Sequence, residues 1–111
     1  ELYPQGIENV VMGMARYGLP LIVTESGLAD AEDRYRPWYI EETLRSLYRT
    51  IENGANLRGY LHWSLLDNFE WDKGFWPRFG LVSVDRKTMK RMPRRESVDT
   101  YRKIIKKGIE E

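Results

Sequence analysis

Two short segments with the composition of β-strands stand on either side of one helical segment, and this order leaves few folds open to the chain. Residues 20–24, Pro-Leu-Ile-Val-Thr, are apolar and β-branched and end at a turn marked by Gly27, and residues 57–63, Leu-Arg-Gly-Tyr-Leu-His-Trp, are the second candidate strand. Between them, apolar residues recur at helical spacing in a segment that Pro37 opens and Gly54 closes. We expect a parallel strand–helix–strand unit, whose crossover is right-handed in nearly all known cases.

Further elements are expected before and after this unit. A helix should lie between Pro4 and Gly18, a short hairpin over residues 82–92, and a last helix from Ser97 to about Lys107. The residues that share one face by helical spacing are Ile7, Val10, Val11, Met14 and Tyr17 in the first helix and Ile40, Leu44, Leu47, Tyr48 and Ile51 in the second. The last helix should carry Val98, Tyr101, Ile104 and Ile105 inward.

The length and composition of the chain fit a single α/β domain over residues 1–111, with 41% hydrophobic residues and a net charge of +1. Two strands cannot close a barrel, and they leave sheet edges and helix faces uncovered. The chain also begins with Glu1 and enters a helix almost at once, so we expect a piece of a longer protein. The rest would come from a longer chain or a second one, with symmetric self-association a less favoured alternative.

Glu25 follows the first predicted strand and is the first candidate for chemistry. The carboxyl ends of parallel strands are where barrel enzymes place their catalytic groups. A retaining glycosidase uses two carboxyl groups about 5 to 5.5 Å apart, one as nucleophile and one as acid and base. Thr24-Glu25-Ser26-Gly27 alone is also compatible with a carboxylate that merely pairs with an arginine at a strand end.

The segment after the second predicted strand, residues 63–71 (Trp-Ser-Leu-Leu-Asp-Asn-Phe-Glu-Trp), carries two tryptophans and two carboxylates in a loop. Exposed aromatic rings are costly unless a pocket holds them. A sugar has an apolar face and a rim of hydroxyls, which suits an indole ring beside Asn68 and Glu70. The alternative is that both tryptophans plug the mouth of a barrel while Glu70 is solvated or ion-paired.

These residues resemble the retaining β-glycosidases of glycoside hydrolase family 1, and the resemblance covers nearly the whole chain. The family has T-E-N-G at the nucleophile, where this chain has residues 24–27, and its W-S-L-L-D-N-F-E-W segment is matched at every position of residues 63–71. Further matches are Arg34-Tyr35, Arg78-Phe79-Gly80-Leu81-Val82, Val84-Asp85 and Lys90-Arg91-Met92-Pro93. The hyperthermophile members, with their D-R-Y-R-P segment, look most similar.

The resemblance implies the C-terminal part of a (β/α)8 TIM barrel, about strands 7 and 8 with their helices, incomplete on its own. Glu25 would be the nucleophile in the hydrolysis of β-glycosidic bonds of glucosides and related sugars, with retention of configuration. Glu70 would accept hydrogen bonds from the sugar 4- and 6-hydroxyls, Trp71 would bind the 3-hydroxyl, and Trp63 would stack under the ring. Phe79 would also bind substrate.

Departures from the family pattern limit what the chain can do alone. The acid/base glutamate of an N-E-P segment does not occur, and a (β/α)8 barrel takes about 250 residues. The expected partners are therefore a β-linked sugar and the remainder of the barrel, and we expect the isolated chain to be inactive. Ser26 replaces the usual Asn, Thr43 replaces a frequent His, and an extra residue lies near 95–97.

Two other functions stay open. A non-catalytic sugar-binding module would use Trp63, Glu70 and Trp71 alone, whereas a purely structural piece of a barrel would bind nothing by itself. The sequence leaves sugar and aglycone preference undetermined. It favours the structural piece over the binding module, because half a pocket should bind poorly.

Composition argues against several other classes of protein. With no cysteine, disulfides are excluded and a cytoplasmic protein is favoured; 32% charged residues favour a thermophilic source. His62 is the only histidine and is expected to be a packed core residue, so neither a metal nor a cofactor is expected.

Residues 86–107 are basic but lack interleaved aromatic rings, which argues against binding of nucleic acid. No apolar run is long enough for a membrane span.

Overall fold

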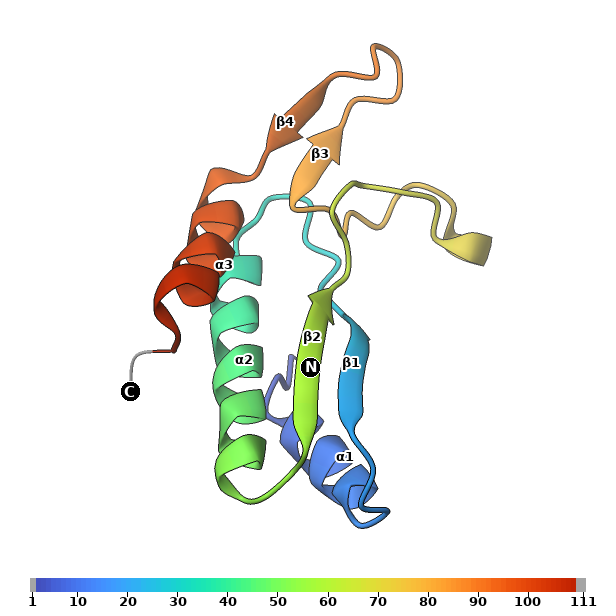
Figure 1. Ribbon diagram of the computed structural model, residues 1–111. Helices are drawn as coiled ribbons and strands as arrows, with labels where there is room; N and C mark the ends of the chain where they lie inside the picture. Colours follow the sequence, from blue (N-terminus) through green and yellow to red (C-terminus); the bar gives the residue numbers. More distant parts are fainter. Residues whose placement is uncertain (1, 110–111) are drawn as a thin grey trace.

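The computed structural model describes residues 2–109 and places the predicted elements in the predicted order (Figure 1). The elements are α1 (Gly6–Ala15), β1 (Leu21–Ser26), α2 (Arg36–Glu52), β2 (Leu57–His62), the 3-10 helix η1 (Trp71–Lys73), β3 (Val82–Val84), β4 (Arg91–Pro93) and α3 (Arg95–Lys107). The hairpin and the loop that carries η1 extend beyond the carboxyl ends of β1 and β2 (Figure 1).

Strands β1 and β2 pair in parallel, with Leu21 opposite Leu57 and Ser26 opposite His62, and α2 makes the connection between them. The predicted strand–helix–strand unit is therefore confirmed. Strand β1 runs two residues further than the predicted end at Thr24, because Ser26 still pairs with β2. Glu25 consequently lies within the strand and not in the turn after it.

The core of the unit lies between the sheet and the helices α1 and α2. Val11, Leu47 and Ala55 are its buried residues, and Leu21, Val23, Leu57 and Tyr60 are among the side chains packed against them. Arg49 of α2 donates to the Glu8 carboxylate of α1 over 3.0 Å. These contacts fix both helices on the sheet whose carboxyl ends carry the candidate site.

Several apolar positions on the predicted helix faces are exposed. They are Val10, Met14 and Tyr17 of the first helical segment, Tyr48 and Ile51 of α2, and Ile105 of α3. Ile22 and Leu61 of the strands are also about 60% exposed. The physical reason is that a two-stranded sheet is too narrow to cover the apolar faces of the helices beside it. The expectation that helix faces stay uncovered in this chain is therefore confirmed, whereas the prediction that Ile105 faces inward is wrong.

The hairpin of β3 and β4 was predicted correctly and leads directly into α3. Val84 pairs with Arg91, and the Asp85 carboxylate in the turn accepts hydrogen bonds from the Lys87 and Thr88 amides. Helix α3 begins at Arg95, two residues before the predicted start.

Candidate active site

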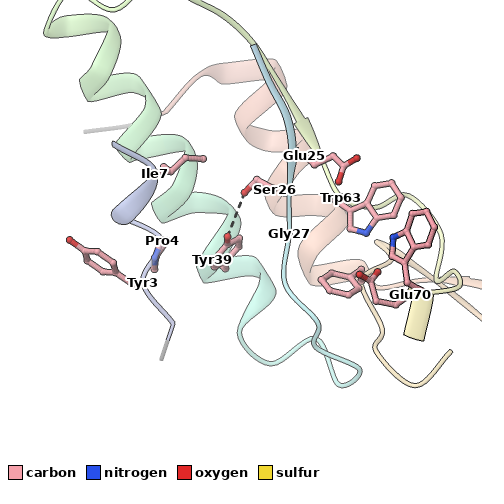
Figure 2. A pocket seen from close by; sticks show the side chains of 11 residues that line it. Tyr3, Pro4, Ile7, Glu25, Ser26, Gly27, Tyr39, Trp63 and Glu70 are labelled. Carbon is pink, nitrogen blue, oxygen red and sulfur yellow. Dashed lines mark hydrogen bonds between the residues drawn. The ribbon is translucent and has the colours of Figure 1, made fainter. Parts of the chain in front are cut away.

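A depression of about 540 Å³ lies at the carboxyl ends of β1 and β2 and brings all five predicted site residues together. The lining residues are Tyr3, Pro4, Ile7, Glu25, Ser26, Gly27, Tyr39, Trp63, Glu70, Trp71 and Phe79. Figure 2 shows Glu25, Trp63 and Glu70 on one side of the β1 ribbon and Ser26 and Tyr39 on the other. The chemistry therefore gathers on the Glu25 face, since consecutive strand residues point to opposite faces.

Glu25 presents an exposed carboxylate to this depression. Among residues 2–109, no arginine or lysine lies within ion-pair distance of it, and the described part of the chain supplies no hydrogen-bond donor to its oxygens. The alternative in which Glu25 merely pairs with an arginine therefore finds no support in the described residues. A carboxylate in this state can accept a proton or attack an electrophilic carbon.

The end of β1 is held from two directions. The Trp63 amide donates to the Ser26 carbonyl over 2.8 Å, and the Tyr60 hydroxyl donates to the same oxygen over 3.4 Å. On the opposite face, the hydroxyls of Ser26 and Tyr39 lie 3.5 Å apart (Figure 2). A Cβ atom at Gly27 would lie 1.7 Å from the Trp63 carbonyl oxygen, so glycine is required there. The Trp63–Ser64 peptide bond is cis.

The loop after β2 is closed on itself by backbone hydrogen bonds. The Ser64 amide donates to the Phe79 carbonyl over 3.2 Å, and the Glu70 amide donates to the Gly74 carbonyl over 2.7 Å. Trp71 projects from this loop with 81% of its surface exposed. Asn68, which the sequence places beside the sugar, instead donates its side-chain amide to the Ser64 hydroxyl and to the Leu66 carbonyl. Asn68 therefore shapes the loop and is outside the lining.

Sequence reasoning missed a buried arginine that organises the loop after Glu25. The guanidinium of Arg36 is fully buried, pairs with the Asp33 carboxylate, and donates to the carbonyls of Asp30 (2.5 Å) and Arg78 (2.7 Å). The Asp33 carboxylate also accepts hydrogen bonds from the Ser97 hydroxyl (2.6 Å) and amide (3.3 Å), which caps the first turn of α3. The D-R-Y-R-P pattern was the available signal, although spacing alone did not show which arginine is buried.

The Asp30 carboxylate also holds this loop, through hydrogen bonds to backbone amides. Partial burial works against ionisation of its carboxyl, but hydrogen bonds from the backbone amides of Tyr35 and Arg36 outweigh burial and lower its pKa below the usual value. The Asp30 carboxylate, which accepts hydrogen bonds from these two amides, is therefore ionised at neutral pH and holds this side of the loop.

His62 lies behind the site as a partly buried ring. Its Nδ1 atom is 3.1 Å from the Tyr60 hydroxyl, and its ring contacts those of Tyr60 and Tyr101. Burial, together with the positive charge of Arg36, lowers the pKa of His62 to about 4. The expectation of a packed histidine is confirmed. Within residues 2–109, no group of three or more His, Asp or Glu side chains is placed to hold a metal ion.

The comparisons with known proteins agree with this geometry. Residues 1–109 match the model of glycosyl hydrolase family 1, and the chain belongs to that family. It is 44% identical over 105 residues to a β-galactosidase of Pyrococcus woesei, covering 95% of this chain and 21% of that protein. It is 46% identical over 109 residues to a β-galactosidase of Saccharolobus solfataricus, covering 97% of this chain and 22% of that one.

Solved structures give the same relationship. The hyperthermophilic β-glucosidase of Pyrococcus furiosus superimposes with a TM-score of 0.92 and 48% identity, over 99% of this chain and 24% of that enzyme. The β-glycosidase of Thermosphaera aggregans superimposes with a TM-score of 0.91 and is 41% identical, over 100% of this chain and 23% of that enzyme. The chain therefore spans between a fifth and a quarter of the length of these relatives, several of which come from hyperthermophiles. No helix in the described part of the chain has the length and apolarity that a membrane crossing needs.

Proposed function

We propose that this chain supplies strands 7 and 8 of a (β/α)8 barrel and that, with the rest of the barrel, it hydrolyses β-glycosidic bonds with retention of configuration. The observation that carries the proposal is the exposed carboxylate of Glu25, which has no ion-pair partner among residues 2–109 and lies in the same depression as Trp63 and Glu70. A carboxylate beside an indole ring and a second acceptor is what a sugar's anomeric carbon, apolar face and hydroxyls require.

In the proposed reaction, a Glu25 oxygen attacks the anomeric carbon, and the bond to the leaving-group oxygen breaks. A glutamic acid from the remainder of the barrel gives its proton to that oxygen. The same glutamate then takes a proton from water, and the water oxygen replaces Glu25 at the anomeric carbon. Two inversions give net retention. Trp63, Glu70, Trp71 and Phe79 hold the sugar while this occurs.

The exposed apolar faces support the proposed need for the rest of the barrel. Ile22 and Leu61 of the sheet and Val10 of α1 are each about 60% exposed or more, which is costly in water. Further strands and helices on both sides would cover them. The chain alone would then be an assembly piece that lacks the acid/base carboxyl.

The test is a chimaera in which residues 1–109 replace the matching segment of the Pyrococcus furiosus β-glucosidase. The TM-score of 0.92 makes this graft structurally reasonable. The chimaera should cleave a chromogenic β-glucoside, and proton NMR should show the β-anomer of glucose as the first product. The isolated chain should show no turnover. A folded chimaera without activity, or a first product of α-configuration, would reject the proposal.

A further inference from the structure

We propose that Asp67 and Arg94 are a positioning pair that sets the sugar-binding loop against the loop that follows Glu25. This inference rests on the proposed glycosidase function. Neither side chain lines the depression, yet together they contact the backbone of Gly80, the residue after Phe79, and that of Ala31 in the loop after Glu25. They would act on the sugar only through the residues they hold.

The Asp67 carboxylate is a point to which several segments are attached. Its side chain is only 3% exposed, and its oxygens accept hydrogen bonds from the amides of Gly80 (2.9 Å) and Val84 (3.4 Å). Arg94 donates to both oxygens, over 3.1 and 3.2 Å, and Arg78 adds a longer contact of 3.5 Å. A buried carboxylate needs such partners, and they fix its place closely.

The Arg94 guanidinium extends this attachment to the other loop. Its side chain is 9% exposed, and besides Asp67 it donates to the carbonyls of Gly80 (2.6 Å) and Ala31 (3.4 Å). Ala31 belongs to the loop after Glu25, whereas Gly80 ends the loop that carries Trp63 and Glu70. One planar group thus joins both loops, which the compact ammonium of a lysine cannot do with the same geometry.

Phe79 is the lining residue most directly held by this pair. It lies between Arg78 and Gly80, both of which bond Asp67, and its carbonyl accepts the Ser64 amide. Glu70 is three residues after Asp67 in the same loop. Glu25, by contrast, is held through Ser26 and has no contact with the pair. Loss of the pair should therefore weaken sugar binding more than it slows the chemical step.

The experiment uses the chimaera and its variants Asp67→Asn and Arg94→Lys. The first preserves shape and removes charge, and the second preserves charge and removes the planar fork. The matched controls are Asp99→Asn and Arg102→Lys, which alter an exposed Asp–Arg pair of α3. Four quantities are measured: KM and kcat for the chromogenic glucoside, Kd for glucose from tryptophan fluorescence, and Tm.

Both site variants should raise KM and the Kd for glucose about tenfold while kcat changes less than about threefold, and the controls should leave all three unchanged. If KM and Kd stay at the parent values while Tm falls, the pair only stabilises the fold and the inference is wrong. Should Asp67→Asn fail to fold, Arg94→Lys carries the same test. Failure of the proposed glycosidase function can be told apart from failure of this inference, because it appears as an inactive parent chimaera. In that case the Kd for glucose still tests the pair.

Discussion

The backbone amide of Trp63 donates a hydrogen bond to the carbonyl oxygen of Ser26 over 2.8 Å, so the residue that opens the aromatic loop is tied to the residue directly after Glu25. The two motifs are about forty positions apart in sequence, and this bond joins them at the carboxyl end of the sheet. Parallel pairing of β1 and β2 is what makes such a contact possible, because both strands end at the same edge.

Close approach of these strands makes Gly27 intolerant of a side chain. A Cβ atom there would overlap the Trp63 carbonyl oxygen at 1.7 Å, so Gly27→Ala should lower the free energy of unfolding of the chimaera by about 3 kcal/mol. Gly13→Ala is the control, because nothing lies within 4 Å of its added methyl group on α1. That variant should gain ~0.5–1 kcal/mol through helix propensity. Guanidinium unfolding measures both, and equal stabilities would contradict the structure.

Trp71 should matter for sugar binding and not for folding. It is 81% exposed, so Trp71→Ala removes little buried surface, yet the ring lines the depression. We expect KM for the glucoside to rise about tenfold, with Tm unchanged. Trp76→Ala is the matched control, since Trp76 is 73% exposed and lies outside the lining. If both substitutions changed KM equally, a specific role for Trp71 would be excluded.

The stability of the chimaera should depend on the protonation of His62. The folded-state pKa is about 4 and the unfolded value is about 6.5, so below pH 6.5 the unfolded chain binds more protons. This histidine therefore lowers stability progressively as pH falls from 6.5 towards 4, and has no such effect above that range. The loss should reach about 1–3 kcal/mol.

Guanidinium unfolding at pH 7.5 and 4.5, for the chimaera and for His62→Gln, isolates the histidine contribution. The parent should lose more stability than the variant between these pH values. If both lost the same amount, the His62 ring would not be held neutral in the folded protein.

Glu25→Gln should reduce glucoside hydrolysis by the chimaera by several orders of magnitude while leaving Tm nearly unchanged. The carboxylate is exposed and has no partner within the described residues, so the fold loses little, whereas the amide is a poor nucleophile. Glu32→Gln is the control: its carboxylate is 71% exposed and pairs with Arg34 in the neighbouring loop. Near-normal turnover in Glu25→Gln would exclude Glu25 as nucleophile.

The order of elements could be predicted from the sequence because it depends on local periodicity. The apolar run at residues 20–24, the helical spacing from Ile40 to Leu47 and the turn at Asp85 each act over a few residues. Uncovered helix faces were also expected, because two strands are too few to cover them, but the particular residues that stay exposed, among them Tyr48, Ile51 and Ile105, could not be predicted in the same way. Apolar spacing shows which face of a helix is suited to burial, and it does not show whether this chain contains what covers that face.

The five candidate site residues could be located from two motifs and a resemblance, and the structure brings them into one depression. Their supporting contacts were not predictable. Asp33 and Ser97 are 64 positions apart, and Asp67 and Arg94 are 27 apart, so no local pattern indicates that they meet. Among many charged residues, only the three-dimensional packing distinguishes the buried Arg36 from the exposed Arg34.

Trapping the covalent intermediate shows whether Glu25 attacks the anomeric carbon. The chimaera is incubated with a 2-deoxy-2-fluoro-β-glucoside bearing a good leaving group, which slows hydrolysis of the glycosyl ester, and peptide mass spectrometry then locates the sugar. We expect one equivalent of fluorosugar on the peptide that contains Glu25, and none in the Glu25→Gln variant. Labelling of another carboxylate, or an active chimaera that accumulates no labelled peptide, would contradict it.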